Sequence, residues 1–342
     1  MNKSINKIMG MTLATVIGAG GLLGTVTGVS ADSKGVDYYE PTKSEGVLDE
    51  KWGYPTLVFG GGLTDKQQDE TADELGIKGK VIKEESTGKD LVRYLGGGVG
   101  DTTTMKSSVL ITKKDKIKGV EVTIVTPDNI TVITPKQYEK VALNMAETGL
   151  DIKVASVEKV SGESALTGVY KALEVNGVEV SEGQMEVSNA ETSTFAKITE
   201  DNKENASYNP DDATVLLSKL QSEVKALKDK QNELLSEDQI KDLINKEVEK
   251  QGLEKVITPQ ATDLLVSTLQ VYQNTPEIID SKLITDNNKE FVKDLSKDLD
   301  KGFNYLKDKA SNVDMGAVKD DAQGFFSRVW SSVKSFFSSF GS

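Results

Sequence analysis

Residues 120–147 read VEVTIVTPDNITVITPKQYEKVALNMAE and contain the clearest secondary-structure signals in the chain. Apolar and polar side chains alternate at the start of residues 120–126, which predicts a strand there. A second short strand is expected at residues 130–133. Thr134 and Gln137 then form a capping box, with proline at the first helical position, so a helix is expected to run to about residue 147. A strand followed closely by a helix indicates a mixed domain.

Similar signals lie on both sides of this stretch. Thr64 and Gln67 form another capping box, ahead of a helix that Gly76 ends. The mixture predicts an α+β domain, or an α/β domain, over residues 51–190, preceded by a weakly ordered lead-in at residues 32–50. Further strands are expected at residues 56–59, 80–83, 109–112 and 152–157, and a further helix at about residues 163–174.

The periodicity changes in the second half of the chain. Residues 191–211 are polar and poor in large apolar side chains, which predicts a linker. Further helices are expected after Ser236, after Thr258 and around Phe291, so residues 212–310 are predicted to form an all-helical region. Its first helix carries a heptad seam of Ala213, Leu217, Leu220, Val224, Leu227, Gln231 and Leu234. That seam favours packing inside the chain, with a coiled coil between two chains as the alternative.

Composition excludes several classes of function. The chain has 41 Lys and Arg against 54 Asp and Glu, a formal net charge of -13, which repels polyphosphates, so nucleic acid is not an expected partner. Because the chain has no histidine and no cysteine, it has no Ser-His-Asp triad, no Cys-His pair and no usual zinc site. No phosphate-binding loop or calcium loop pattern occurs, and no cofactor or metal is expected. The residue types present leave open carboxylate-pair hydrolysis, Ser-Lys catalysis and oxygen-ligand metal binding by Asp and Glu, although no spacing pattern predicts any of them.

The first residues have the pattern of a secretory signal peptide. Lys3 and Lys7 precede an uncharged stretch over residues 8–29, and Val29-Ser30-Ala31 supplies a small-residue cleavage pattern. We therefore expect residues 1–31 to be a signal peptide, a mature chain that begins at Asp32, and a place of action outside the cytoplasm. An uncleaved membrane anchor is the alternative, because the uncharged stretch is long enough to span a bilayer.

The last residues, 324–342, have the pattern of an amphipathic helix. At about 100° per residue their large apolar side chains share one face and serines and cations share the other. The face packs on the chain's own helices, on a partner envelope protein or a second copy, or on a membrane surface. The polar residues 311–323 before it are predicted to be a linker. The eight apolar residues are Phe325, Phe326, Val329, Trp330, Val333, Phe336, Phe337 and Phe340.

Several sequence words in the middle of the chain occur in a fixed order. They are Ser107 to Thr112, Lys118 to Val122, Thr126 to Thr131, Val154 to Val157 and Gly162 to Ala172. In these words the chain resembles the YpuA-like secreted family of Gram-positive bacteria, a domain of unknown function, over roughly residues 50 to 300. The resemblance implies an exported, cell-envelope-associated protein of Gram-positive type and implies no reaction, substrate or catalytic residue.

The last of these words gathers hydroxyls and a carboxylate at an expected helix start, in Ser161, Glu163, Ser164 and Thr167. Free amides there favour anions, but the alternative is plain capping, with Ser161 as the N-cap. The sequence as a whole favours an exported cell-envelope protein with a non-enzymatic binding or structural role. The alternative is a carboxylate-dependent hydrolase acting on a cell-wall glycan, which needs two acids about 5–10 Å apart.

Overall fold

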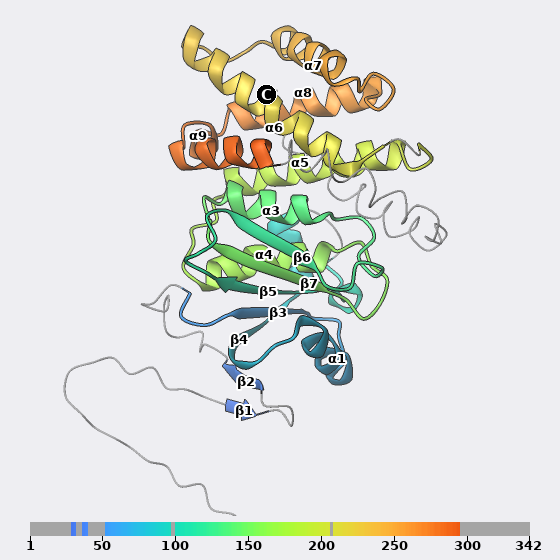
Figure 1. The fold of residues 1–342 in the computed structure, drawn as a ribbon, viewed down its shortest axis with the longest axis vertical. Helices are drawn as coiled ribbons and strands as arrows, with labels where there is room; N and C mark the ends of the chain where they lie inside the picture. The colour runs from blue at the N-terminus through green and yellow to red at the C-terminus, as the bar shows by residue number, and fades with distance from the viewer. Residues whose placement is uncertain (1–28, 32–35, 40–51, 97–99, 206–207, 295–342) are drawn as a thin grey trace, which may run out of the picture.

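The computed structural model describes residues 29–31, 36–39, 52–96, 100–205 and 208–294. These residues form a mixed β-sheet with helices on both faces, followed by a region of several helices that packs on one of the helical layers (Figure 1). The α+β class with a helical C-terminal part, predicted from the sequence, is confirmed.

The described strands form one sheet in the order β1-β2-β4-β3-β5-β7-β6. Parallel pairs join β2 to β4, β4 to β3 and β6 to β7, whereas β5 runs antiparallel to both β3 and β7. The short edge strand β1 runs antiparallel to β2. The strand bounds are β1 (Val29–Ala31), β2 (Val36–Tyr39), β3 (Thr56–Gly60), β4 (Gly79–Ser86), β5 (Ser108–Lys113), β6 (Val120–Ile124) and β7 (Leu150–Ala155).

Helices cover both faces of this sheet. Three of them begin with complete capping boxes, formed by Thr64 with Gln67, Thr87 with Asp90 and Thr134 with Gln137. The first and third of these boxes were expected from the sequence, whereas the second and its helix were not. The elements are α1 (Asp65–Leu75), α2 (Gly88–Leu95), the 3-10 helix η1 (Thr102–Thr104), α3 (Pro135–Asn144) and α4 (Glu163–Val175).

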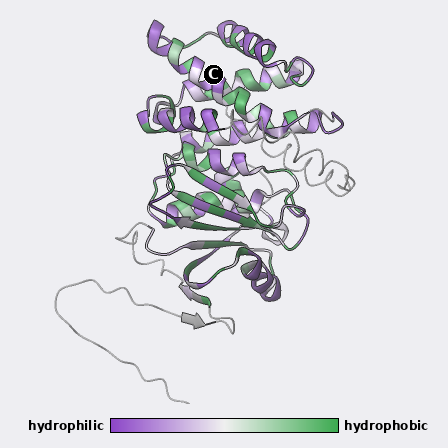
Figure 2. Ribbon diagram, in the orientation of Figure 1, coloured by the Kyte–Doolittle hydropathy of each residue, from purple (hydrophilic) through white to green (hydrophobic). Residues whose placement is uncertain are grey.

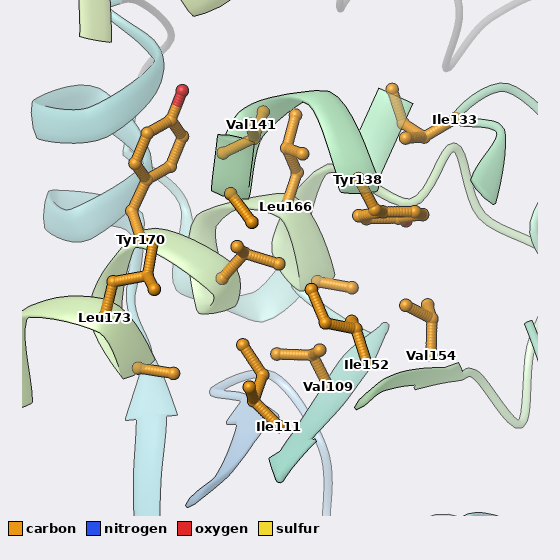
Figure 3. Packing of buried hydrophobic residues seen from close by; sticks show 14 of the residues in the cluster. Val109, Ile111, Ile133, Tyr138, Val141, Ile152, Val154, Leu166, Tyr170 and Leu173 are labelled. Atoms are coloured by element: carbon orange, nitrogen blue, oxygen red, sulfur yellow. The ribbon is translucent and has the colours of Figure 1, made fainter. Parts of the chain in front are cut away.

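Alternation along β3 gives the sheet two separate cores. Val58 packs on the face covered by α2, α3 and α4, while its neighbours Leu57 and Phe59 pack on the face covered by α1. The larger core joins Val109, Ile111, Ile152 and Val154 of the strands to Leu166, Tyr170 and Leu173 of α4 and to Tyr138 and Val141 of α3 (Figure 3). Helix α4 buries several apolar side chains in this core, and each large one contributes about 1.5–3 kcal/mol. This burial anchors α4 on the sheet.

The helical region has its own core, built from amphipathic helices whose apolar faces turn inward (Figure 2). The seam residues Leu217, Leu220 and Val224 are buried in it, so these positions of the heptad pack inside the chain, whereas Leu234 lies beyond the helix end and is exposed. The elements are α5 (Glu182–Asp201), α6 (Pro210–Gln231), α7 (Glu237–Gln251), α8 (Pro259–Gln273), α9 (Pro276–Ile279) and the helical residues 282–294.

The predicted linker at residues 191–211 is wrong over residues 191–201. These residues belong to α5, which lies between the sheet part and the other helices (Figure 1). The helix is polar yet buried because its small hydroxyls bond to backbone: Thr192 Oγ1 donates to Ser188 O at 2.8 Å and Ser193 Oγ to Asn189 O at 2.7 Å. Polarity therefore indicates close helix packing here rather than exposure to solvent.

The predicted strand at residues 130–133 is also wrong. Ile130 makes one isolated bridge to Val160, and the amides of Thr131 and Ile133 bond to the carbonyls of Val160 and Ser161 at 2.9 and 3.0 Å. The segment therefore pairs with the loop before α4 and leaves the sheet. The helix that follows ends at Asn144, earlier than expected.

The lead-in expected at residues 32–50 contains an ordered strand, β2, whose Val36 is buried in the core beside α1. The edge strand β1 consists of the three residues of the predicted cleavage pattern. Residues 1–28, 295–310 and the predicted segments 311–323 and 324–342 lie outside the described residues. Among the described residues, no helix has the length and apolar run that crossing a membrane requires.

Candidate functional site

The hydroxyls of the family-motif words serve to dock α4 on the sheet. Ser107 Oγ and Ser164 Oγ lie 2.7 Å apart, and both side chains are buried. Ser164 Oγ also accepts from the Ser107 amide at 2.8 Å, while Ser107 Oγ accepts from the Ala165 amide at 2.9 Å. The Ser107 hydroxyl accepts from an amide of the first turn of α4, so it caps this helix from a residue next to β5.

The predicted N-cap at Ser161 is wrong. The N-cap is Gly162, with φ of 107° and no side-chain capping bond, and the Ser161 carbonyl instead accepts from the amides of Val132 and Ile133. Glycine is required there because a Cβ would lie 2.5 Å from the hydroxyl of Tyr138, which donates to the Gly162 carbonyl at 2.9 Å.

Glu163 and Thr167, the other two candidate residues of this motif, are also buried. Thr167 Oγ1 donates to the Glu163 carbonyl at 3.0 Å. The structure therefore brings Ser164 together with Ser107, and it places Ser161, Glu163 and Thr167 in the packing of α4. Such an arrangement gives a dissolved anion no open path to the helix start.

A buried ionic network joins the sheet part to the helical region. Lys140 of α3 donates to Gln221 Oε1 of α6 at 3.0 Å and to Asn288 Oδ1 at 2.7 Å, and its ammonium lies 3.8 Å from Glu191 Oε1 of α5. Four helical segments thus meet at one side chain. The ring of Phe291 lies beside the same ammonium, at 5.9 Å.

The carboxylate of Glu191 is held from three directions. Asn144 Nδ2 donates to its Oε2 at 2.8 Å, and Gln221 donates to its Oε1. Burial lowers the pKa of Lys140, while Glu191 and Glu139 oppose that change. With side-chain exposures of 4% for Lys140 and 1% for Glu191, the pair is closed to any substrate, so its role is structural.

The network extends to the floor of a cleft at Asn288, whose side chain is itself buried. Its Nδ2 donates to the Ser218 carbonyl at 3.1 Å and to Ser222 Oγ at 3.2 Å, on the opposite side from Lys140. Ser222 and Asn288 line a cleft of 390 Å³ between α6, α8 and the helical residues 282–294. The floor of an open cleft is therefore one hydrogen bond from the buried lysine.

The cleft is lined by charges of both signs. On α6, Lys225 Nζ lies 2.6 Å from Asp229 Oδ1; on the opposite wall, Lys282 pairs with Asp286. The third carboxylate of the cleft, Asp280, accepts from Lys228 at 2.9 Å. The remaining lining residues that matter here are Lys289, 3.9 Å from Asp286, and Tyr272, whose ring belongs to the helical core.

The pKa of Asp286, in the cleft, and that of Glu139, outside it, are shifted in opposite directions. The hydrogen bond from Lys282 lowers the pKa of Asp286 in the cleft. Outside the cleft, burial raises the pKa of Glu139 to about 7, opposed by Lys136, and burial also raises the pKa of Glu186 and of Asp212. Glu139, whose pKa lies near neutral, does not line the cleft.

The apolar residues predicted as a site and the residues that line the cleft are different sets. The eight apolar candidates from Phe325 to Phe340 lie outside the described residues. None of the cleft residues is predicted as a site from the sequence, because Lys and Asp four positions apart on a helix, as at 225 and 229, are typical of any solvated face. Only the packing of three helices that are distant in sequence brings them together.

Within the described residues, no group of three Asp or Glu side chains is placed to share a metal ion. The chemistry available in the cleft is hydrogen bonding and charge pairing, from ammonium, carboxylate, hydroxyl and amide groups.

Comparison with known proteins extends over both parts of the molecule. A family model described as "Protein of unknown function (DUF1002)" matches residues 59–291, from β3 to the helical residues that line the cleft. The chain is also similar to "Uncharacterized protein YpuA" of Bacillus subtilis (strain 168), with 27% identity over 158 residues; the alignment covers 44% of this chain and 53% of that protein. No solved structure matches the chain. The resemblance to YpuA-like proteins seen in the sequence is thus confirmed, and the chain belongs to the DUF1002 family of proteins of unknown function.

Proposed function

We propose that this protein is exported and works at the envelope of a Gram-positive cell as a non-enzymatic binding protein. Export is supported by the cationic start at Lys3 and Lys7, the uncharged stretch that follows, and the Val29-Ser30-Ala31 pattern. The envelope is supported by the resemblance in sequence words described above. Removal of residues 1–31 would take away β1, an edge strand, and leave the order of the other six described strands unchanged.

The observation that carries the binding role is the pairing of each cleft carboxylate with a lysine. Hydrolysis by two carboxylates needs one acid that is protonated near neutral pH and a second that stays ionised across a groove. In the cleft, Asp229, Asp280 and Asp286 each contact a lysine ammonium, and the hydrogen bond from Lys282 lowers the pKa of Asp286. Glu139, whose pKa of about 7 would suit an acid, is bound to Lys136 and lies outside the cleft. These features suit a site that holds a ligand without cleaving it.

The apolar face expected at residues 324–342 adds a second means of attachment to this proposal. Eight large apolar side chains on one side of a helix favour burial against an envelope protein, a second copy or a membrane surface. The net charge of -13 disfavours nucleic acid as a partner.

Export is tested by fractionation of cells that produce the full chain, with N-terminal sequencing of the recovered protein. We expect the protein in the envelope or the medium with Asp32 as its first residue. Recovery from the cytosol with Met1 in place would contradict export.

The non-enzymatic role is tested with the purified protein and purified peptidoglycan. We expect the protein to sediment with the wall material and to release no soluble fragments. Release of fragments that is lost in both Asp229→Asn and Asp286→Asn would instead establish the hydrolase alternative. A Lys241→Gln variant, which changes an exposed helix pair with Glu237 away from the cleft, is the matched control.

A further inference from the structure

We propose that the cleft between α6, α8 and the helical residues 282–294 takes a short zwitterionic peptide. Its terminal carboxylate would contact the lysines of the cleft, and its terminal ammonium would contact the aspartates. This inference rests on the binding role proposed above and adds to it the chemical class of the ligand.

The first support is the charge balance of the lining. Three lysines and three aspartates line the cleft, so their formal charges cancel, in a chain whose net charge is -13. A site for an anion would carry an excess of cations, and a site for a cation would carry an excess of carboxylates. The lining residues of charge are Lys225, Lys282, Lys289, Asp229, Asp280 and Asp286.

The second support is that both walls carry both signs. Lys225 and Asp229 belong to α6, and Lys282 and Asp286 belong to the facing helical segment. Exposed ion pairs of this kind are weak, so a ligand carboxylate can replace Asp229 at the Lys225 ammonium with little loss. The ammonium at the other end of the ligand can likewise replace a lysine at Asp286. A zwitterion keeps the charge balance of the cleft, and the displaced Asp229 and Lys282 side chains are exposed enough for water to solvate them.

Other ligand classes fit these walls less well. Phosphate or another anion meets three carboxylates, and a metal ion competes with the lysine ammonium bound at each aspartate. A neutral sugar offers hydroxyls, which do not compensate a separated charge. It also needs an open aromatic face, whereas Tyr272 is only 5% exposed.

The size and the neutral groups of the cleft agree with a peptide. Its volume of 390 Å³ lies within the range of small-molecule sites, about 300–1,000 Å³. At the floor, the Ser222 hydroxyl donates to the Ser218 carbonyl and accepts from Asn288, which leaves its second lone pair to accept an N–H of the peptide.

The test is a titration of the purified protein with trialanine, followed by calorimetry and by NMR. The probes are free trialanine, its N-acetylated form, its C-terminally amidated form and the disaccharide chitobiose. We expect free trialanine to bind and each capped form to bind about tenfold more weakly, because each cap removes one charge. We also expect the side-chain amide signal of Asn288 to shift, since Asn288 lies at the cleft floor.

Two variants separate the ends of the ligand. Lys225→Gln should weaken the binding of free trialanine about fivefold to tenfold and leave the binding of the amidated form unchanged. Asp286→Asn should weaken the binding of free trialanine to the same extent and leave the binding of the acetylated form unchanged. Lys241→Gln, at an exposed pair on α7, is the control and should bind as the unaltered protein does. All three exposed variants are expected to fold, and the far-ultraviolet circular dichroism spectrum checks this.

The proposal is overturned if free and capped trialanine bind equally, if chitobiose binds better than trialanine, or if trialanine does not bind at concentrations of about 10 mM. Because this assay is done in solution with defined probes, its failure leaves export and wall association to be judged by fractionation and sedimentation alone.

Discussion

Two lysine–carboxylate contacts of this protein lie in different environments: Lys140 with Glu191 in the interior, and Lys225 with Asp229 in the wall of the cleft. The first pair has side-chain exposures of 4% and 1%, and amides of Asn144 and Gln221 complete its hydrogen bonds. The second pair has exposures of 20% and 54% and lies in the wall of the cleft. In the interior the removal of one partner leaves a charge that nothing compensates, whereas at the cleft water or a ligand takes its place.

Lysine and carboxylate side chains thus serve stability in the buried network and are available for binding in the cleft. The buried network specifies how the helical region docks on α3, because each of its groups has a partner from another element. The ion pairs of the cleft add little to the packing of the helices, which the apolar core already fixes. Their side chains can therefore exchange one ionic partner for another. Asn288 belongs to both sets, since it accepts from Lys140 and donates to Ser222.

The largest effect is expected from Lys140→Met. This change leaves Glu191 as an unpaired buried carboxylate and should lower the free energy of unfolding by about 3–5 kcal/mol, measured by urea denaturation. The double variant Lys140→Met with Glu191→Gln should recover a large part of that loss, because no buried charge remains. A loss below about 1 kcal/mol in the single variant would show that the network has no structural role.

A smaller, pH-dependent effect is expected at Glu139, which contacts Lys136 and faces the charges of Asp211 and Asp294. Burial raises its pKa from the ordinary 4.5 to about 7, so the folded state binds more protons than the unfolded state between these values. The resulting stability, about 3 kcal/mol, is fully present below pH 4.5, falls between pH 4.5 and 7, and is lost as the pH rises through 7. Urea denaturation of the unaltered protein and of Glu139→Gln at several pH values measures it. The difference between the two should vary over this window, and a constant difference would be evidence against the assignment.

A moderate effect is expected from Gly168→Ala in α4. Alanine normally stabilises a helix by about 1 kcal/mol relative to glycine. Here the new Cβ would lie 2.8 Å from Val109 Cγ1 and 3.3 Å from Val58 Cβ, so we expect a destabilisation of about 1–3 kcal/mol in thermal unfolding. Gly119→Ala, where a Cβ meets nothing within 4 Å, is the control and should be near neutral. Stabilisation by Gly168→Ala would mean that α4 does not lie this close to the sheet.

The smallest effect on stability is expected from Lys225→Gln. The pair with Asp229 lies at the cleft surface, so its loss should change the free energy of unfolding by less than about 1 kcal/mol. Chemical denaturation checks this, and a loss as large as that of Lys140→Met would erase the distinction between the two sites.

Local signals were enough to predict much of the fold. Capping boxes at Thr64, Thr134 and Ser236 depend on residues three positions apart, and all three begin helices in the structure. Alternation likewise predicted the strand that became β6. The failures arose where tertiary contacts override local pattern. Polar α5 is buried because its hydroxyls are satisfied by its own backbone and by neighbours, as in the 2.8 Å contact between Thr194 and Thr268.

The candidate sites were less predictable from sequence than the fold. Ser164 was identified within its motif, but its partner Ser107 lies 57 positions away, and only the folded chain shows that the two hydroxyls satisfy each other. Lys140 and Asn288 are separated by 148 positions, and nothing local marks either as part of a network. A charged residue on a helix has the same sequence pattern whether it is solvated, buried in a pair or placed in a cleft.

One crossed measurement tests this separation most directly: trialanine affinity and free energy of unfolding, both determined for Lys225→Gln and for Asp286→Asn together with the unaltered protein. We predict that each variant loses about fivefold or more in affinity while its unfolding free energy changes by less than about 1 kcal/mol. Unchanged affinity, or affinity and stability lost together, would contradict the account.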